Sequence, residues 1–130
     1  MLQIAFGMAL VALGIYAAPQ GDHNADVSRA ERVLQFHPRS DDWIAAGAVK
    51  MFLDGVIEGH TAAMLAPYGD DPKQFGSLRW DPEQYNKTVA ALDRQGIQVY
   101  THAIGDRAVR VALDAYQSAA TENHTRDRRH

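Results

Sequence analysis

The chain has 130 residues, of which 46% are hydrophobic, enough for one modest core, so composition alone predicts a single soluble globular domain. Its net charge of -3 gives no long-range attraction to nucleic acid, which we therefore exclude as a partner. The chain contains no cysteine, so disulfides, thiolate nucleophiles and cysteine-based zinc sites are excluded, and a metal would need histidine, carboxylate or modified lysine as ligands.

The segment 2–18 carries no charge and is followed by Pro19. Two interpretations are open: a buried strand or helix of a larger fold, or a signal peptide or membrane anchor. No Lys or Arg precedes the segment, and it is shorter than the roughly 20 residues that span a bilayer comfortably. We therefore favour the buried element and a cytoplasmic location, with a signal or anchor at residues 1–18 as the alternative.

The middle of the chain predicts a helix, a strand and a loop. Residues 25–36 place apolar side chains at helical spacing and predict a short amphipathic helix. Residues 48–53 form an apolar run interrupted by Lys50 and predict a buried parallel strand. Residues 54–80 have no sustained period and many Gly, Pro and Asp, so we expect a long loop; loops of this length are usually functional.

The third quarter of the chain contains a clear helix signal. Asp81 is a good N-cap, Pro82 suits the first helical position, and Gly96 supplies a C-terminal stop. The apolar residues of this helix fall on one face: Tyr85, Val89 and Leu92.

A second strand is predicted at residues 97–103, and a further helix begins at Gly105–Asp106. Its apolar residues at helical spacing are Val109, Ala112, Leu113, Tyr116 and Ala120. Strand, helix, strand and helix in this order predict an α/β fold with parallel strands covered by helices. The polar segment 121–130 contains no further apolar run, and we expect it to fray.

Lys50 is unusual because apolar residues flank it on both sides. A buried ammonium is costly unless it pairs with a carboxylate, reaches solvent or loses its charge. A neutral lysine amine can react with carbon dioxide, and the resulting carbamate can bridge two metal ions. A structural ion pair and a chemical role both remain open, and the ion pair is the commoner outcome.

His102 lies at the end of the second strand, just before Gly105–Asp106. A lone histidine is usually a hydrogen-bonded structural residue, but neutral imidazole at a strand end is also a common zinc ligand. Asp106 is most simply the N-cap of the following helix, with support of a metal ligand as the smaller possibility.

The loop after the first strand contains Asp54, Glu58 and His60, with glycines that let the backbone bend close to a ligand. Asp54 and His60 could contact the substrate or support a metal ligand, although loop glycines mostly mark turns. The other histidines lie in polar or turn segments and are expected at the solvated surface: His23, His37, His124 and His130.

Four stretches together resemble a known family. They are residues 47–65 with Pro67–Tyr68, then residues 80–82, then residues 102–108, then residues 126–130. In this order and separation they resemble the YtcJ-like branch of the metal-dependent amidohydrolases, the amidohydrolase-3 type, over residues 46–130. Residues 1–45, an apolar segment and a short helix, match only weakly.

This resemblance implies the middle βα units of a (β/α)8 barrel that hydrolyses a C–N bond in amide or formamide-type small molecules. It implies one or two divalent metal ions, zinc being the expected one, that activate water. Lys50 matches the lysine that ends the fourth strand, carboxylated in related members, and His102 matches the strand-five histidine ligand. Asp54, His60 and Asp106 are then expected to support these ligands or to contact the substrate.

Other parts of the family pattern have no counterpart in these residues. They are the His-x-His pair of the first strand, the strand-six histidine and the strand-eight aspartate base. We therefore expect a partial barrel that is inactive alone, with unpaired strand edges that favour self-association. The alternative is a non-catalytic binding or membrane-associated module that retains barrel motifs.

Overall fold

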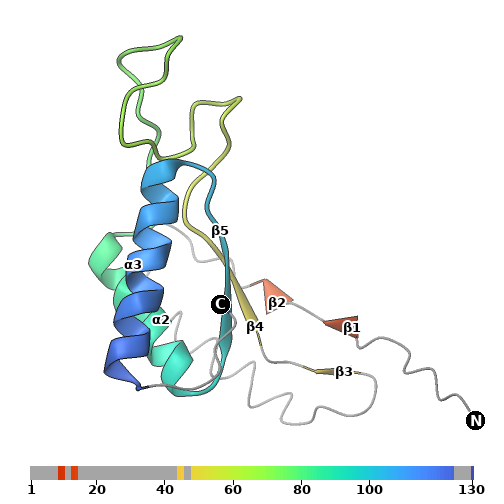
Figure 1. Ribbon diagram of the computed structural model, residues 1–130. Coiled ribbons are helices and arrows are strands. Elements are labelled where there is room, and N and C mark those ends of the chain that lie inside the picture. Colours follow the sequence, from red (N-terminus) through yellow and green to blue (C-terminus); the bar gives the residue numbers. More distant parts are fainter. Residues whose placement is uncertain (1–8, 11–12, 15–43, 46–47, 125–129) are drawn as a thin grey trace, which may run out of the picture.

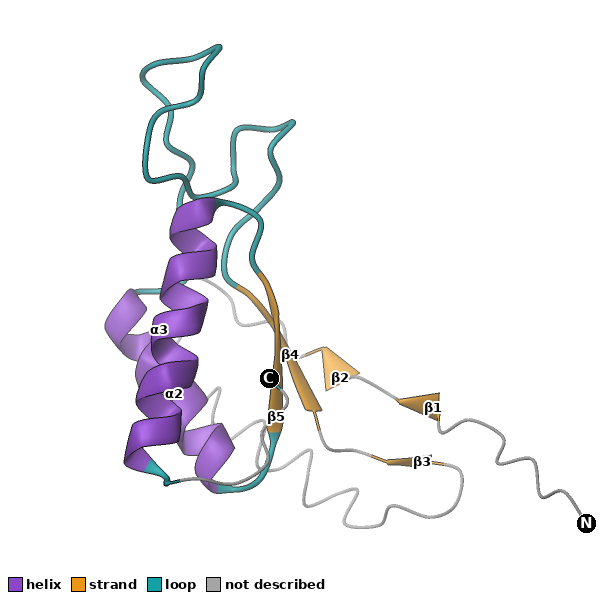
Figure 2. Ribbon diagram, viewed as in Figure 1, coloured by secondary structure: helices purple, strands orange, loops and turns teal. Residues whose placement is uncertain are grey.

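The computed structural model describes residues 9–10, 13–14, 44–45, 48–124 and 130. Two helices cover one side of a small set of strands, and long loops extend beyond the ends of the strands (Figures 1 and 2). In chain order the elements are β1 (Ala9–Leu10), β2 (Leu13–Gly14), β3 (Ile44–Ala45), β4 (Ala48–Phe52), α2 (Pro82–Arg94), β5 (Gln98–His102) and α3 (Asp106–Glu122).

The strands form a parallel sheet with the order β2-β4-β5. β4 and β5 pair along their whole length, from Ala48 opposite Gln98 to Phe52 opposite His102. Parallel neighbours need a crossover connection, and α2 supplies it between β4 and β5. The predicted strand–helix–strand–helix order is confirmed, and the loop predicted at residues 54–80 contains no helix or strand.

Short strands precede this unit. Within the apolar segment 2–18, Leu13–Gly14 pairs in parallel with β4, and Ala9–Leu10 pairs with β3. The helix expected at residues 25–36 and the histidines His23 and His37 lie outside the described residues. Among the helices that the structure describes, none is both long enough and apolar enough to cross a membrane.

Helix α2 begins and packs as its sequence predicts. The Asp81 side chain accepts hydrogen bonds from the backbone N–H groups of Glu83 and Gln84 at 3.0 and 3.1 Å, and Pro82 opens the helix. Gly96 follows the helix with a φ of 81°, a left-handed conformation that favours glycine. The predicted apolar face is confirmed, because Tyr85, Val89 and Leu92 are all buried.

Helix α3 follows its predicted apolar spacing only in part. Ala112 is buried and Tyr116 packs against the core, but Val109 and Leu113 are 39% and 59% exposed. The buried face consists of alanines: Ala108, Ala112, Ala115 and Ala119. Alanine brings no long side chain to the contact, so α3 can lie close against α2, while Val109 and Leu113 point away from it.

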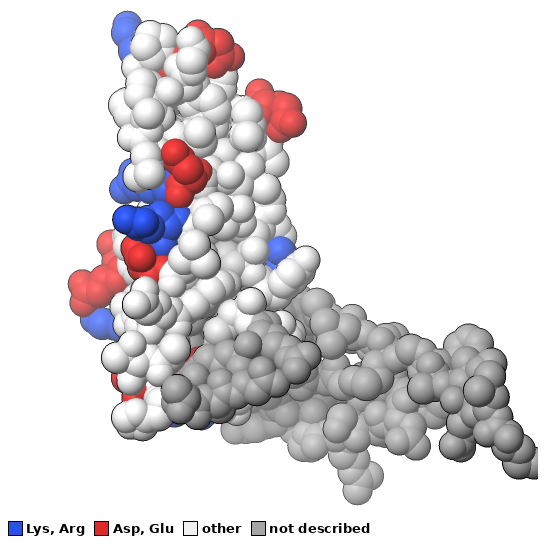
Figure 3. Space-filling model, in the orientation of Figure 1, with Lys and Arg blue, Asp and Glu red and all other residues white. Residues whose placement is uncertain are grey.

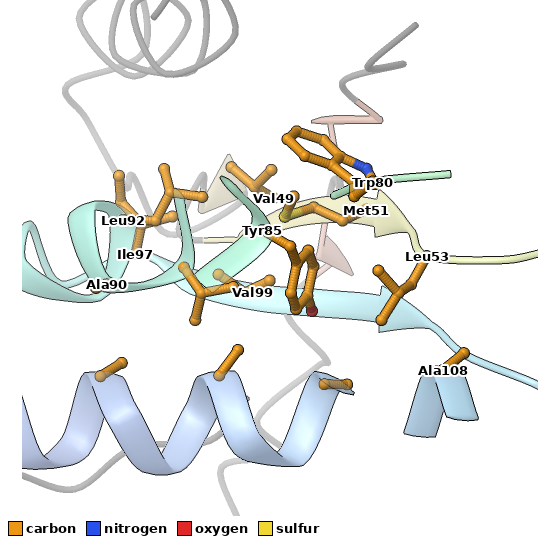
Figure 4. Packing of buried hydrophobic residues seen from close by; sticks show 14 of the residues in the cluster. Val49, Met51, Leu53, Trp80, Tyr85, Ala90, Leu92, Ile97, Val99 and Ala108 are labelled. Atoms are coloured by element: carbon orange, nitrogen blue, oxygen red, sulfur yellow. The ribbon is translucent and has the colours of Figure 1, made fainter. Parts of the chain in front are cut away.

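The core fills the space between the sheet and the two helices. Figure 4 shows Val49, Met51 and Val99 of the strands together with Tyr85 of α2 in this layer. Neighbouring residues of a strand point to opposite faces. Phe52 and Tyr100 are accordingly exposed, whereas Ala48 on the same face is buried, so the prediction of a buried strand is confirmed for the face toward the helices and is wrong for the later part of the other face.

The side chain of His130 is only 6% exposed, which contradicts its predicted place at the solvated surface. Its Nδ1 accepts a hydrogen bond from the Val99 N–H at 3.1 Å, and its Nε2 lies 3.1 Å from a carboxylate oxygen of the fully buried Asp93. Asn123 donates to the other Asp93 oxygen at 2.8 Å, and the His130 ring stacks on Tyr116. His130 was misplaced because these partners come from three other elements; His124 is exposed, as predicted.

Candidate functional site

Lys50 and His102 lie on the same face of two adjacent parallel strands. Lys50 is directly opposite Tyr100 in the register of β4 and β5, and Phe52 is opposite His102. Because side chains alternate along a strand, all four project to the face away from the helices. His102 is the last residue of β5, but Lys50 is the third of five residues in β4, because pairing with β5 extends the strand to Phe52.

The Lys50 amine lies against aromatic rings. Its nitrogen is 4.2 Å from the centre of the Tyr100 ring and 5.2 Å from that of Phe52. The negative face of an aromatic ring attracts a cation, so both rings can hold the end of the lysine side chain in this position. No carboxylate among the described residues forms an ion pair with this amine, so its described partners are the two rings and not the ion pair that was one of the open interpretations.

His102 is held by the loop that follows β4. Its Nε2 is 2.9 Å from the carbonyl oxygen of Gly55 and 4.0 Å from a carboxylate oxygen of Asp54. The Phe52 ring lies against the imidazole with ring centres 5.3 Å apart. The side chain remains 24% exposed, so a small ligand can still reach the imidazole.

Asp54 joins the loops that follow the two strands. One of its carboxylate oxygens accepts backbone N–H groups of Ala63 and Gly105 at 2.9 and 2.7 Å, and the other accepts that of Ile104 at 3.0 Å. The residue is 1% exposed, so three main-chain donors replace water around its carboxylate. Asp54 therefore holds the loop after β4, at Ala63, to the segment that directly follows His102.

Asp106 connects the start of α3 to the same loop. It is the first helical residue and Gly105 is the N-cap, so the predicted capping role of Asp106 is wrong by one position. Its carboxylate instead accepts the Leu65 N–H at 2.7 Å, while the Ala63 carbonyl accepts the N–H of Arg107. A Cβ at Gly105 would lie 2.0 Å from the Ala63 carbonyl oxygen, so this close approach requires glycine.

His60 makes its described contacts within the loop. Its Nε2 lies 3.0 and 3.1 Å from the two carboxylate oxygens of Asp70, and its ring is 4.4 Å from that of Tyr68. The hydrogen bond with His60 lowers the pKa of Asp70 below its ordinary value. None of these contacts reaches Lys50 or His102, so the structure does not join His60 to the candidate site.

The described residues fit a divalent metal in part. Imidazole nitrogen and a lysine carbamate are suitable donors, and Lys50 and His102 share one face of the sheet. The described part of the chain contains no group of three His, Cys, Asp or Glu residues that could hold a metal ion. A catalytic zinc normally has three protein ligands and a water, so Lys50 and His102 alone are too few to make up such a set.

Two residues of this face escaped the sequence analysis. Phe52 and Tyr100 contact the side chains of Lys50 and His102, and each lies two positions from a candidate ligand in its own strand. That period of two was a usable signal, because it places all four side chains on one face.

Figure 3 shows that charged side chains of the described part gather mainly along the helices and at the loop tips.

Comparison with known proteins agrees with this architecture. Residues 4–130 match the model of the amidohydrolase family called Amidohydro_3, so the match begins well before residue 46. The chain is 41% identical over 88 residues to the protein LONG AFTER FAR-RED 3 of Arabidopsis thaliana, covering 68% of this chain and 15% of that protein. It is 34% identical over 106 residues to YtcJ of Bacillus subtilis (strain 168), covering 82% and 20%.

A solved structure gives the same result. An uncharacterized metal-dependent hydrolase from Pyrococcus horikoshii matches with a TM-score of 0.64 and 29% identity, over 72% of this chain and 20% of that one. The chain thus spans between 15% and 20% of the length of these proteins. With a family model that covers nearly all of its residues, the chain belongs to the amidohydrolase family, in its YtcJ-like branch.

Proposed function

We propose that this chain supplies part of the metal centre of an amidohydrolase barrel that cleaves C–N bonds in amide or formamide-type small molecules. The observation that carries the proposal is the common face of Lys50 and His102 on adjacent parallel strands. In a (β/α)8 barrel that face points to the barrel interior, and the loops after the strands form the active site. The similarity to metal-dependent hydrolases supports this placement.

In this proposal Lys50 and His102 are ligands of a divalent metal, zinc by its preference for nitrogen and oxygen donors. The bound metal would lower the pKa of a water molecule and polarise the scissile carbonyl. For Lys50 to contribute an anionic oxygen, its neutral amine adds to carbon dioxide and releases one proton, which leaves a carbamate. The described residues contain no third ligand, so the remaining donors come from other strands of the barrel.

The proposal can be tested in a chimera. Residues 4–130 would replace the matching segment of the Bacillus subtilis relative, and the purified chimera would be assayed for metal content and for hydrolysis of N-substituted formamides. We expect metal-dependent hydrolysis that Lys50→Ala and His102→Ala each reduce at least about 100-fold, together with the bound metal. Lys87→Ala is the control, because Lys87 is exposed on α2 and pairs with Glu83.

Two results would contradict the proposal. One is a folded chimera that keeps its metal and its hydrolysis rate after both substitutions at Lys50 and His102. The other is measurable hydrolysis of the same formamides by the 130-residue chain carrying both substitutions, because the chain would then act without the proposed ligands.

A further inference from the structure

The oxygen contacts that the structure describes for the His102 imidazole lie at its Nε2 atom. The Nε2 atom faces two acceptors, the Gly55 carbonyl oxygen at 2.9 Å and a carboxylate oxygen of Asp54 at 4.0 Å. Both oxygens of that carboxylate already accept backbone N–H groups, and at 4.0 Å the carboxylate is beyond hydrogen-bond distance of Nε2. A carbonyl oxygen cannot donate, so the Nε2–Gly55 contact is a hydrogen bond only when Nε2 carries the proton.

A neutral imidazole has one protonated and one unprotonated nitrogen, and the partner of the first decides the role of the second. We propose that the main-chain carbonyl of Gly55 is a positioning group that holds His102 in the Nε2–H tautomer and leaves Nδ1 as its donor to a divalent metal. The proposal rests on the proposed metal site and adds the device that prepares one of its ligands. The Phe52 ring, packed against the imidazole, restricts its rotation.

The Gly55 carbonyl is held in place by contacts that only glycine permits. The Gly55 N–H donates to the Thr61 carbonyl at 3.1 Å, and the Thr61 hydroxyl accepts the next backbone N–H, that of Val56, at 2.9 Å. A Cβ at Gly55 would lie 2.1 Å from the Thr61 hydroxyl oxygen and 2.6 Å from its Cβ. Alanine at this position therefore forces the loop to move and carries the carbonyl away from His102.

The first test is the tautomer of His102 in the 130-residue chain. Long-range ¹H–¹⁵N correlation spectra at alkaline pH, where imidazole is neutral, distinguish the two tautomers, and comparison with His102→Gln assigns the signals. We expect His102 to be predominantly the Nε2–H tautomer without any metal. A predominantly Nδ1–H tautomer, or an equal mixture, would overturn the proposal, and this result requires no variant of the loop.

The second test moves the carbonyl. Gly55→Ala should convert His102 to a mixture of tautomers and weaken zinc binding, measured by calorimetry, by about 10–100-fold, the usual effect of losing a group that orients a metal ligand. Adding Thr61→Gly removes the clashing atoms and should restore the tautomer and most of the affinity. Gly59→Ala is the matched control, since a Cβ there meets nothing closer than 3.7 Å.

The outcomes separate this inference from the proposed function. Lys50→Ala should abolish zinc binding while the His102 tautomer stays unchanged. If zinc binds but Gly55→Ala leaves the tautomer unaltered, the role of the carbonyl is wrong and the metal site stands. If the tautomer responds to Gly55→Ala but the wild-type chain binds no zinc, the carbonyl positions His102 and the metal site is wrong.

Discussion

The two faces of the β4–β5 sheet have opposite properties. The face toward the helices carries Met51 and Val99, which are 4% and 0% exposed and lie in the core. The other face carries Lys50 and His102 with their aromatic neighbours, and Tyr100 is 58% exposed there. Because successive residues of a strand alternate between these faces, a residue of the candidate site and a residue of the core can be direct neighbours in the sequence, as Lys50 and Met51 are.

The largest difference between the two faces is expected when two neighbouring residues of β4 are substituted separately. Met51→Ala removes a buried side chain from the core and should lower the free energy of unfolding by about 2–5 kcal/mol. Lys50→Ala, one position earlier, should lower it by less than about 1 kcal/mol, the value of a partly exposed cation–π contact. Urea denaturation of both variants measures the difference, and equal losses would show that the faces are not distinct.

The next largest loss of stability is expected at Asp54, which holds the loop after β4 and the loop after β5 together. Asp54→Asn replaces an acceptor oxygen by an amide donor opposite buried N–H groups and should cost about 1–3 kcal/mol in unfolding free energy. Asp114→Asn, at an exposed position of α3, is the control. Equal stability of the two variants would contradict the bridging role of Asp54.

A smaller effect is expected at the opposite end of β5. His130→Ala removes the acceptor of the Val99 N–H and one partner of the buried Asp93, and should lower the unfolding free energy by about 1 kcal/mol. His124→Asn is the control, because His124 is exposed and asparagine tolerates its φ of 63°. Thermal unfolding that does not distinguish the two variants would place His130 back at the surface.

The smallest effect concerns the loop, away from both faces. His60 lowers the pKa of Asp70, so the stabilisation from this contact is present above the ordinary value of 3.8 and is lost as the pH falls through the lower folded pKa. An NMR titration of the Asp70 carboxyl should give a midpoint below 3.8 that rises toward it in His60→Asn. A midpoint that does not move in this variant would show that His60 is not the cause.

Part of the fold followed from local sequence signals. Asp81 and Pro82 predicted the start of α2. The large apolar residues of this helix identified its buried face, because large apolar side chains fill most of the core. For α3 the helical spacing included Ala112, which is buried, but also Leu113, which is exposed, and it omitted the other buried alanines: Ala108, Ala115 and Ala119. A preference for large residues cannot reveal a contact made by small ones.

The candidate site, like the fold, could be predicted from the sequence only in part. The sequence identified Lys50 and His102 by their place in apolar strands, and the resemblance supplied their chemistry. It did not reveal the three backbone donors to Asp54 or the Gly55 carbonyl on His102, because such partners depend on how the loop folds back. Main-chain groups are present at every position, so no residue type marks them.

We propose that the open face of the sheet binds a metal through Lys50 and His102. A calorimetric zinc titration of the 130-residue chain and of Lys50→Ala, with bicarbonate present so that the carbamate can form, tests this binding. We expect binding no tighter than micromolar, since two donors are fewer than a full set, and a clear loss in Lys50→Ala. Nanomolar binding that persists in the double variant Lys50→Ala, His102→Ala would contradict it.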